Sequence, residues 1–201
     1  MCEKKVVVAF DFDGTLTSRD TLLEFIVFSK GPAVLYGTFL FFSPLLLLYK
    51  AGLYPNWKIK EKIFSYLYKG MSITDFDAHC EAFFESRGRA LIRAKAWRAV
   101  REHLRAGHET LILTASIVNW VRPFGRALGI GRVEGTRIEV SDEGHITGRF
   151  LTQNCYGAEK VARLRALFPD RGRYYLTAYG DSRGDRELLC YADEGYLRAF
   201  E

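Results

Sequence analysis

Residues 5–15 read KVVVAFDFDGT, and this stretch decides the fold that we predict for the 201-residue chain. After Lys5, its first residues are apolar and mostly β-branched, which is typical of a short strand buried on both faces of a parallel sheet. Two aspartates and a glycine follow within the next four residues. Sites in open α/β sheets lie at the carboxyl ends of the strands. The stretch therefore predicts a parallel sheet and a site at its edge.

The C-terminal half of the chain alternates strand and helix patterns, which indicates that the same sheet continues there. We predict strands over 109–113, 174–179 and 196–200, and helices over 117–128, 158–168 and 187–191. Residues 136–140 and 145–150 flank the sequence Ser-Asp-Glu-Gly, so we expect them to form a β-hairpin. The predicted class is α/β, with a doubly wound parallel sheet.

A long helical insertion separates the first strand from the rest of this sheet. Helical patterns follow one another without a strand signal over 21–29, 57–69, 72–85 and 89–105. We therefore assign residues 1–18 and 95–201 to the α/β core, and residues 19–94 to an all-helical cap.

Residues 31–49 form an uncharged run of nineteen residues between Lys30 and Lys50. The run is long enough to cross a bilayer, but Pro44 should break a helix, so two short apolar helices fit equally well. Three alternatives remain for it: a core hairpin under the cap, a hairpin that dips into a membrane, or a dimer interface. We favour membrane contact, because a core helix is seldom apolar all round.

The positive charge of the chain lies mostly in one segment. The net charge is +5, and residues 50–108 hold twelve Lys and Arg against six Asp and Glu, a balance of +6. This balance indicates an anionic partner. Beside the apolar run, Lys58, Lys60, Lys62, Arg87 and Arg89 would attract anionic headgroups. No aromatic-basic binding motif accompanies the charge, so we predict no nucleic-acid partner.

The four cysteines are Cys2, Cys80, Cys155 and Cys190. Their spacing matches no zinc pattern, and we expect idle or buried thiols in a reducing cytoplasm. The first residues contain no small-residue cleavage site after their apolar run, so we predict no secretory signal peptide.

Polar side chains at three predicted strand ends, and a lysine that begins a predicted helix, are expected to meet at one edge of the sheet. They are Asp11, Asp13, Thr114, Lys160, Asp181 and Asp185. Carboxylates that are brought together repel one another unless a cation lies among them. Oxygen ligands with no His or Cys nearby select a hard ion, so we predict Mg²⁺ as the cofactor.

This set of groups suits a phosphorylated substrate. A phosphoryl group needs a metal ion, a lysine and a hydroxyl around it, and Lys160 and Thr114 would supply the last two. Gly14 would allow a sharp turn whose N–H groups face the phosphate. We predict that Asp11 attacks phosphorus and that Asp13 protonates the leaving oxygen and then activates water.

The motifs in their order resemble the phosphatases of the haloacid dehalogenase superfamily. The matching segments are DFDGTLT at 11–17, LILTAS at 111–116, Lys160, and GDSRGD at 180–185. The resemblance implies a Rossmann-like core, a nucleophilic Asp11, and Mg²⁺ held by Asp11, the Asp13 carbonyl and Asp181. Asp185, Ser182 and Asp20 would support that site. The long insertion resembles the cap of the phosphoserine-phosphatase-like subfamily, IB.

Within that superfamily, the apolar run, the basic cap and CYGAEKV at 155–161 resemble the bacterial phosphatidylglycerophosphate phosphatases of the C type. This resemblance implies a phospholipid substrate and an anionic membrane partner, with the enzyme at the inner face of the cytoplasmic membrane. Asp20 stands where phosphoserine phosphatases carry a substrate-binding Glu, which speaks against phosphoserine. A soluble phosphatase for a small metabolite is the alternative. A non-catalytic membrane-binding module is a second alternative, against which the complete set of acids argues.

Overall fold

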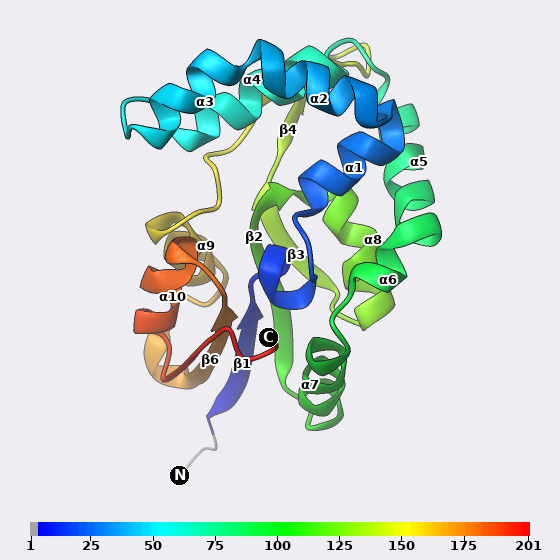
Figure 1. Ribbon diagram of the computed structural model, residues 1–201. Coiled ribbons are helices and arrows are strands. Elements are labelled where there is room, and N and C mark those ends of the chain that lie inside the picture. Colours follow the sequence, from blue (N-terminus) through cyan, green and yellow to red (C-terminus); the bar gives the residue numbers. More distant parts are fainter. Residues whose placement is uncertain (1–3) are drawn as a thin grey trace.

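The computed structural model describes residues 4–201, and a five-stranded sheet lies at its centre (Figure 1). The strands are β1 Lys5–Phe10, β2 Glu109–Ile117, β3 Arg132–Thr136, β6 Tyr174–Gly180 and β7 Glu194–Leu197. Their order is β3-β2-β1-β6-β7, and every neighbouring pair is parallel. The predicted doubly wound parallel sheet is confirmed.

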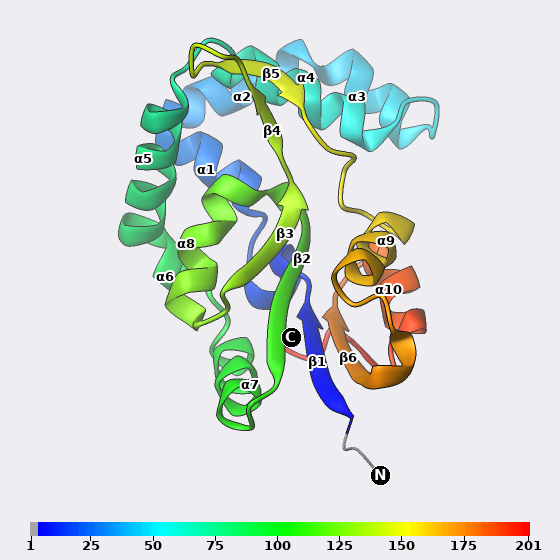
Figure 2. The ribbon, with the colours of Figure 1, turned by 180° about the vertical axis from the view of Figure 1, so that it is seen from behind.

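The central strand β1 is buried on both faces because helices cover the sheet on both sides (Figures 1 and 2). Val8 and Phe10 point to the face that α7 and α8 cover, whereas Val7 and Ala9 point to the face that α9 and α10 cover. All four side chains are fully buried. The apolar run KVVVAF therefore reflects a strand with no solvent face.

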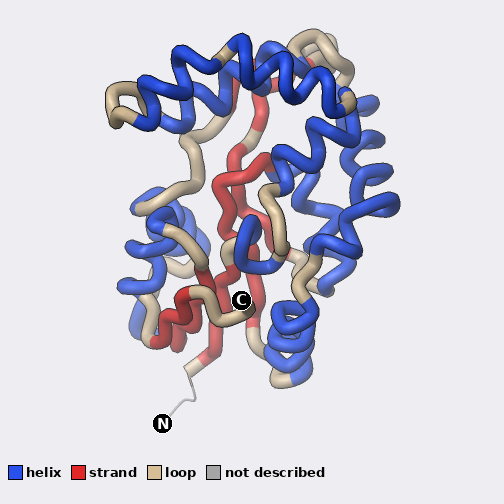
Figure 3. The backbone as a smooth tube through the Cα atoms, in the orientation of Figure 1, coloured by secondary structure: helices blue, strands red, loops and turns tan. Residues whose placement is uncertain are grey.

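The helices lie around and above this sheet, as the blue segments of Figure 3 show. They are α1 Thr21–Lys30, α2 Pro32–Phe41, α3 Ser43–Lys50, α4 Asn56–Tyr68, α5 Ile73–Phe83, α6 Arg89–Leu91, α7 Ala94–Arg105, α8 Val118–Leu128, α9 Ala158–Leu167 and α10 Arg186–Tyr191. Short helical turns occur at Phe12–Leu16, Phe84–Gly88, Arg171–Arg173 and Arg183–Asp185.

Two chain segments that pass between the sheet and the upper helices lie side by side. Thr17 and Ile92 form an antiparallel bridge, the Ser18 N–H donates to Leu91 O at 2.8 Å, and the Arg93 N–H donates to Leu16 O at 2.9 Å. This pairing requires extended backbone at Ile92 and Arg93. The single helix predicted over 89–105 was therefore wrong, because a long-range backbone pairing divides it into α6 and α7.

The predicted hairpin forms, but its first strand is shorter than predicted. It consists of β4 Ile138–Val140 and β5 Ile146–Phe150, whereas Thr136 belongs to β3, a strand that we did not predict. The hairpin contacts the end of α4 and the residues after it: the Gly70 N–H donates to Ile146 O at 2.8 Å. The Phe150 N–H donates to Glu61 Oε2 at 2.8 Å.

The apolar run 31–49 folds as two helices, α2 and α3, which meet at Phe42 just before Pro44. Much of the run is exposed; for example, Leu40 is 77% and Leu47 is 66% exposed. In the described part of the chain, no single helix has both the length and the apolar character to cross a membrane. One bent pair, α1 with α2 at 117°, meets the criteria of length and composition.

Two of the thiols are buried, as predicted, and one is exposed. Cys80 and Cys155 are buried, Cys190 is exposed, and all three are free. Cys2 lies outside the described residues, as does the start of the chain on which the absence of a signal peptide was predicted.

Candidate active site

The adjacent strands β1 and β6 bring three carboxylates together where they end. Asp11 follows β1, and its N–H donates to Tyr179 O of β6 at 2.9 Å. Asp181 follows β6 directly, and Asp185 ends the next helical turn. One oxygen from each of Asp11, Asp181 and Asp185 lies within 4.8 Å of the others. The parallel sheet thus joins residues that are 170 or more positions apart in the chain.

Lys160 of α9 reaches into this cluster and is only 2% exposed. Its Nζ donates to Asp11 Oδ1 and to Asp185 Oδ1, each at 2.5 Å. Burial lowers the pKa of Lys160, but the charges of Asp11 and Asp185 outweigh this effect, and the pKa is raised overall. The side chain is therefore a buried ammonium group that bridges two acids.

Asp185 holds the loop that carries Asp181. Its Oδ2 accepts hydrogen bonds from the Asp181 N–H at 3.2 Å, the Ser182 N–H at 3.1 Å and Ser182 Oγ at 3.0 Å. Since Oδ1 binds Lys160, both oxygens of Asp185 are occupied. Asp185 thus connects Lys160 with the loop of Asp181 and Ser182.

Asp13 lies apart from the lysine and is held by three hydroxyl and amide donors. Its Oδ1 accepts from Thr21 N at 2.7 Å and from Thr21 Oγ1 at 2.6 Å, and its Oδ2 accepts from Ser116 Oγ at 2.5 Å. Burial and then the charge of Asp20 raise the pKa of Asp13 to about 6, against the effect of these hydrogen bonds. Asp11 and Asp13 therefore occupy two distinct environments although only Phe12 separates them.

Ser116 and Thr21 are site residues that we did not predict. A signal for Ser116 was available, because Thr114 and Ser116 are two apart on one strand and so point to the same side. Thr21 has no such signal in the sequence, since α1 alone brings it to Asp13. Asp20, which we predicted as a supporting residue, caps α1 by accepting from the Leu22 N–H at 2.9 Å.

The turn after β1 depends on Gly14. This residue has a φ of 81°, which favours glycine, and a Cβ added to it would collide with the Asp181 carboxylate. Next to it, Thr15 Oγ1 donates to Asp11 Oδ2 at 3.1 Å. The glycine thus permits the close approach of the two strand ends.

Thr114 is buried at the end of β2, where its Oγ1 accepts from the Ser116 N–H at 2.9 Å. Within residues 4–201, the Thr114 hydroxyl donates no hydrogen bond to another side chain or to the backbone. Thr114 thus lies at the same edge of the sheet as Asp11, as predicted. In the described chain, no hydrogen bond joins these two side chains.

The acidic cluster fits a divalent cation by the chemistry of its donors. The cluster holds three carboxyl groups and one lysine, which contacts two of them, and no His or Cys belongs to it in the described chain. Burial, followed by the charges of Asp11 and Asp185, raises the pKa of Asp181 to about 6. A hard cation would offset this repulsion, and carboxylate oxygens are the ligands that Mg²⁺ prefers.

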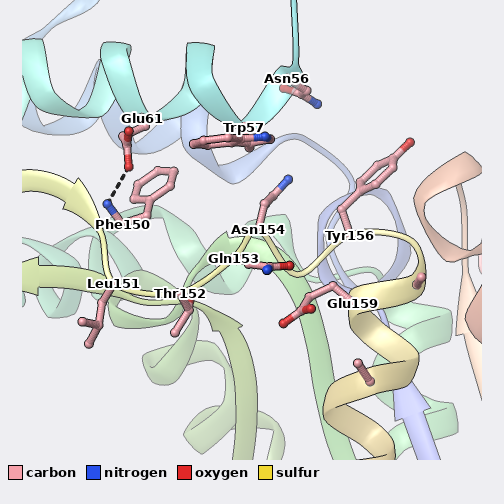
Figure 4. A pocket seen from close by; sticks show the side chains of 12 residues that line it. Asn56, Trp57, Glu61, Phe150, Leu151, Thr152, Gln153, Asn154, Tyr156 and Glu159 are labelled. Carbon is pink, nitrogen blue, oxygen red and sulfur yellow. Dashed lines mark hydrogen bonds between the residues drawn. The ribbon is translucent and has the colours of Figure 1, made fainter.

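Two cavities adjoin these residues. A small one is lined by Ser116, which donates to Asp13, and otherwise by Lys60 and apolar side chains: Leu22, Phe64, Ala115, Ile117, Trp120 and Phe150. A larger cleft of about 1020 Å³ lies between α4 and the start of α9 (Figure 4). None of the predicted site residues lines this cleft, but Glu159, which precedes Lys160, does.

Comparison with known proteins places the chain among hydrolases. A model of the haloacid dehalogenase-like hydrolase family matches residues 8–189. The protein CicA of Caulobacter vibrioides is 36% identical over 200 residues, which cover 100% of this chain and 89% of CicA. A Bordetella pertussis protein of unknown function has a TM-score of 0.78 at 25% identity, over 93% of this chain and 86% of that one. A phosphoserine phosphatase with an analogue of its phospho-aspartyl intermediate has a TM-score of 0.67 at 19% identity, over 97% and 86%.

Proposed function

The chain belongs to the haloacid dehalogenase-like hydrolase family, and on that basis we propose that it is a Mg²⁺-dependent phosphatase that forms an aspartyl-phosphate. One observation carries the proposal. Asp11 contacts a buried lysine, whereas Asp13 is held by Ser116 and Thr21. Two carboxylates in such different environments can serve as nucleophile and as acid/base.

In the proposed reaction, an oxygen of Asp11 attacks phosphorus and the bond from phosphorus to the leaving oxygen breaks. Asp13 donates its proton to that oxygen, and the alcohol leaves. Asp13 then accepts a proton from a water molecule that attacks the phosphoryl group, which releases inorganic phosphate and restores Asp11. The two half-reactions together consume only the phosphate ester and one water molecule.

Lys160 and Thr114 would bind the phosphoryl oxygens, together with backbone N–H groups of the turn at Gly14. Asp11, Asp181 and the backbone carbonyl of Asp13 would hold Mg²⁺, which supplies positive charge to the phosphoryl group when bound. Asp185 would keep Lys160 and the Asp181 loop in place through the contacts of its two oxygens.

For the substrate, we propose a lipid phosphate such as phosphatidylglycerophosphate. The small cavity beside Ser116 has an apolar lining with Lys60 as its single charge, and Lys60 has no ion pair within the described chain. Asp20, which stands where phosphoserine phosphatases carry a substrate-binding Glu, caps α1.

A small phosphorylated metabolite is the alternative substrate, and the structural likeness to phosphoserine phosphatase favours it. The two candidate substrates differ in their leaving alcohol. An amino acid carries one positive and one negative charge, whereas a lipid carries a single negative charge and a long apolar part. A non-catalytic membrane module is the weaker alternative, because Asp11, Asp13, Lys160 and Asp181 are all present.

The membrane partner would bind what we call the apolar cap face: Tyr36, Leu40, Phe41, Leu47, Leu53 and Tyr66, all at least 60% exposed. An exposed group of large apolar side chains marks an interaction surface. Lys50, Lys58 and Lys62 belong to helices that carry this face, α3 and α4, and would attract anionic headgroups. We propose peripheral binding of this face to the inner leaflet of the cytoplasmic membrane.

The chemistry is tested with Asp11→Asn and Asp13→Asn on a generic aryl phosphate, with Mg²⁺ and with a chelator. Both variants should fold and lose at least about 100-fold in kcat. Full activity of Asp11→Asn would show that the aspartyl-phosphate mechanism is wrong.

Membrane binding is tested separately, by flotation with anionic vesicles. Leu40→Glu should reduce the bound fraction, and Leu197→Glu is the matched control, since Leu197 is 60% exposed on β7, outside the cap face. Equal flotation of the two variants would contradict the proposed surface.

A further inference from the structure

Residues 114–116 of β2 form a bulge that faces the single residue Gly135 of β3. The register requires this, because the paired positions on either side of the bulge are Leu113 with Glu134 and Ile117 with Thr136. Bulges redirect side chains and are over-represented next to active sites. This bulge carries Ser116, whose hydroxyl donates to Asp13 Oδ2 at 2.5 Å. The position of the bulge therefore determines how the acid/base of the proposed reaction is held.

Two residues of β3 hold this bulge in place. Thr136 Oγ1 donates to Ala115 O, inside the bulge, at 3.0 Å. Gly135 packs so closely that a Cβ added to it would lie 2.7 Å from Ser116 O and 3.0 Å from Thr114 Cγ2. Glycine permits this approach because it has no side chain. A displacement of β3 would therefore displace Thr114 and Ser116 as well.

Arg163 connects β3 with α9, the helix that carries Lys160. Its side chain is 12% exposed, and each guanidinium nitrogen donates one hydrogen bond: Nη1 to Gly135 O, Nη2 to Gln153 O at 2.6 Å, and Nε to Glu159 Oε1 at 3.0 Å. The planar guanidinium group fixes the directions of these three bonds. Lys160 and Arg163 are three positions apart on the helix, so they lie on the same side of it.

The two aspartates of the proposed reaction are held by groups from different elements. Lys160 of α9 donates to Asp11, and Ser116 of β2 donates to Asp13. Both donors must be in place at once, because the nucleophile and the acid/base act on the same phosphoryl group. Arg163 joins the two elements, since it extends from α9 to the backbone that faces the bulge.

We propose that Arg163 is a positioning residue of the phosphatase site, which keeps Lys160 and the β2 bulge at the separation that catalysis requires. This role rests on the proposed phosphatase function, and it belongs to a residue outside the set that would bind the phosphate and the metal ion. The alternative is an arginine that only stabilises the fold. The chain contains a residue of that second kind, which makes a direct comparison possible.

Arg171 makes the same set of contacts as Arg163 at the opposite end of the sheet. It donates to two backbone carbonyls, Tyr174 O at 3.1 Å and Tyr191 O at 3.3 Å, and to Asp193 Oδ2 at 2.8 Å. Arg171 precedes the first residue of β6, whereas the site lies where β6 ends. The loss of either guanidinium group should therefore destabilise the protein, but only the loss of Arg163 should affect catalysis.

The test compares Arg163→Met with Arg171→Met by thermal unfolding and by hydrolysis of an aryl phosphate at saturating Mg²⁺. Both variants should melt about 4–12 °C below the parent protein, because each leaves two carbonyls without a charged donor. Well below its melting temperature, Arg163→Met should lose about 30- to 100-fold in kcat, with KM changed less than about threefold. KM changes little because Lys160 keeps its charge beside Asp11. Arg171→Met should retain the kcat of the parent protein.

Gly135→Ala changes the same connection from the other side and leaves Arg163 intact. The added Cβ would press on Ser116 O and Thr114 Cγ2, so kcat should fall at least about tenfold. Gly131→Ala is the matched control, because Gly131 directly precedes the same strand and its added Cβ would meet no atom within 4 Å. This second pair decides the outcome if Arg163→Met does not fold.

A parent-like kcat in folded Arg163→Met or in Gly135→Ala would overturn the proposed role, as would an equal loss of kcat in Arg171→Met. Each of these results leaves the phosphatase function intact. A parent protein that releases no phosphate from any ester would refute the proposed function and, with it, the role of Arg163.

Discussion

Replacement of Lys160 by Met removes the cation on which the candidate site depends, with little change in side-chain size. The Nζ atom lies 2.5 Å from Asp11 Oδ1 and 2.5 Å from Asp185 Oδ1, and the side chain is 2% exposed. Within residues 4–201, no other Lys or Arg forms an ion pair with either acid. The variant therefore leaves two buried carboxylates without their counter-charge.

Removal of one partner from a buried ion pair costs about 3–5 kcal/mol in the free energy of unfolding. At roughly 2–4 °C per kcal/mol for a chain of this size, the melting temperature should fall by about 6–20 °C. The loss should be smaller with saturating Mg²⁺, because a bound cation would also offset the charge of Asp11. Hydrolysis of an aryl phosphate should fall at least about 100-fold in kcat.

The assay is urea unfolding followed by circular dichroism at neutral pH, with and without Mg²⁺. Lys62→Met is the matched control, since Lys62 is exposed on α4 and its replacement should change the free energy of unfolding by no more than about 0.5 kcal/mol. The double variant Lys160→Met with Asp185→Asn should recover about half of the lost stability, because one of the two like charges is gone, but it should recover no activity.

A Lys160→Met protein within about 1 kcal/mol of the parent, measured without Mg²⁺, would refute the reasoning about the buried charges. Retained hydrolysis at the parent rate would refute the proposed role of Lys160 at the phosphate.

Three other changes test the rest of the site. Gly14→Ala should lower kcat at least about tenfold, because the added Cβ would displace Asp181. It should also cost about 1–2 kcal/mol of stability, because a φ of 81° is strained for alanine. Parent-like kinetics would contradict this prediction. Ser116→Ala should lower kcat about tenfold at unchanged KM, since Asp13 loses a 2.5 Å hydrogen bond; a change confined to KM would count against it. Mg²⁺ at about 100 times its Kd should stabilise the parent protein by about 2.7 kcal/mol, and it should stabilise the Asp181→Asn variant much less. Equal stabilisation of the two proteins in a melting experiment would show that Asp181 is not a ligand.

The strand β1 and its aspartates could be predicted because the signal is local. The eleven residues from Lys5 to Thr15, a run of β-branched residues that ends in Asp-Phe-Asp-Gly-Thr, are enough to predict a buried strand with a site at its end. The same holds for the break before Pro44, where the proline ring is incompatible with a continuing helix. The confirmed sheet class followed from the alternation of such local signals.

The division of 89–105 into α6 and α7 could not be predicted from local pattern. Its residues favour a helix throughout, but two backbone hydrogen bonds keep Ile92 and Arg93 extended: the Arg93 N–H donates to Leu16 O, and the Ser18 N–H donates to Leu91 O. The strand β3 was missed for a related reason, since Arg132–Thr136 has few β-branched residues and is stabilised by its pairing with β2.

At the site, the sequence alone determined which residue types are available: two aspartates after one strand, two after another, and a lysine at the start of a helix. Only the tertiary structure decided how they are paired. Lys160 bridges Asp11 and Asp185, whereas Asp13 accepts hydrogen bonds from Ser116 and Thr21. The tertiary structure also placed Trp57 over the cleft beside α9. Charge and hydrogen-bonding capacity belong to each residue by itself, but the contacts depend on distances across parallel strands and packed helices, which no stretch of the chain specifies alone.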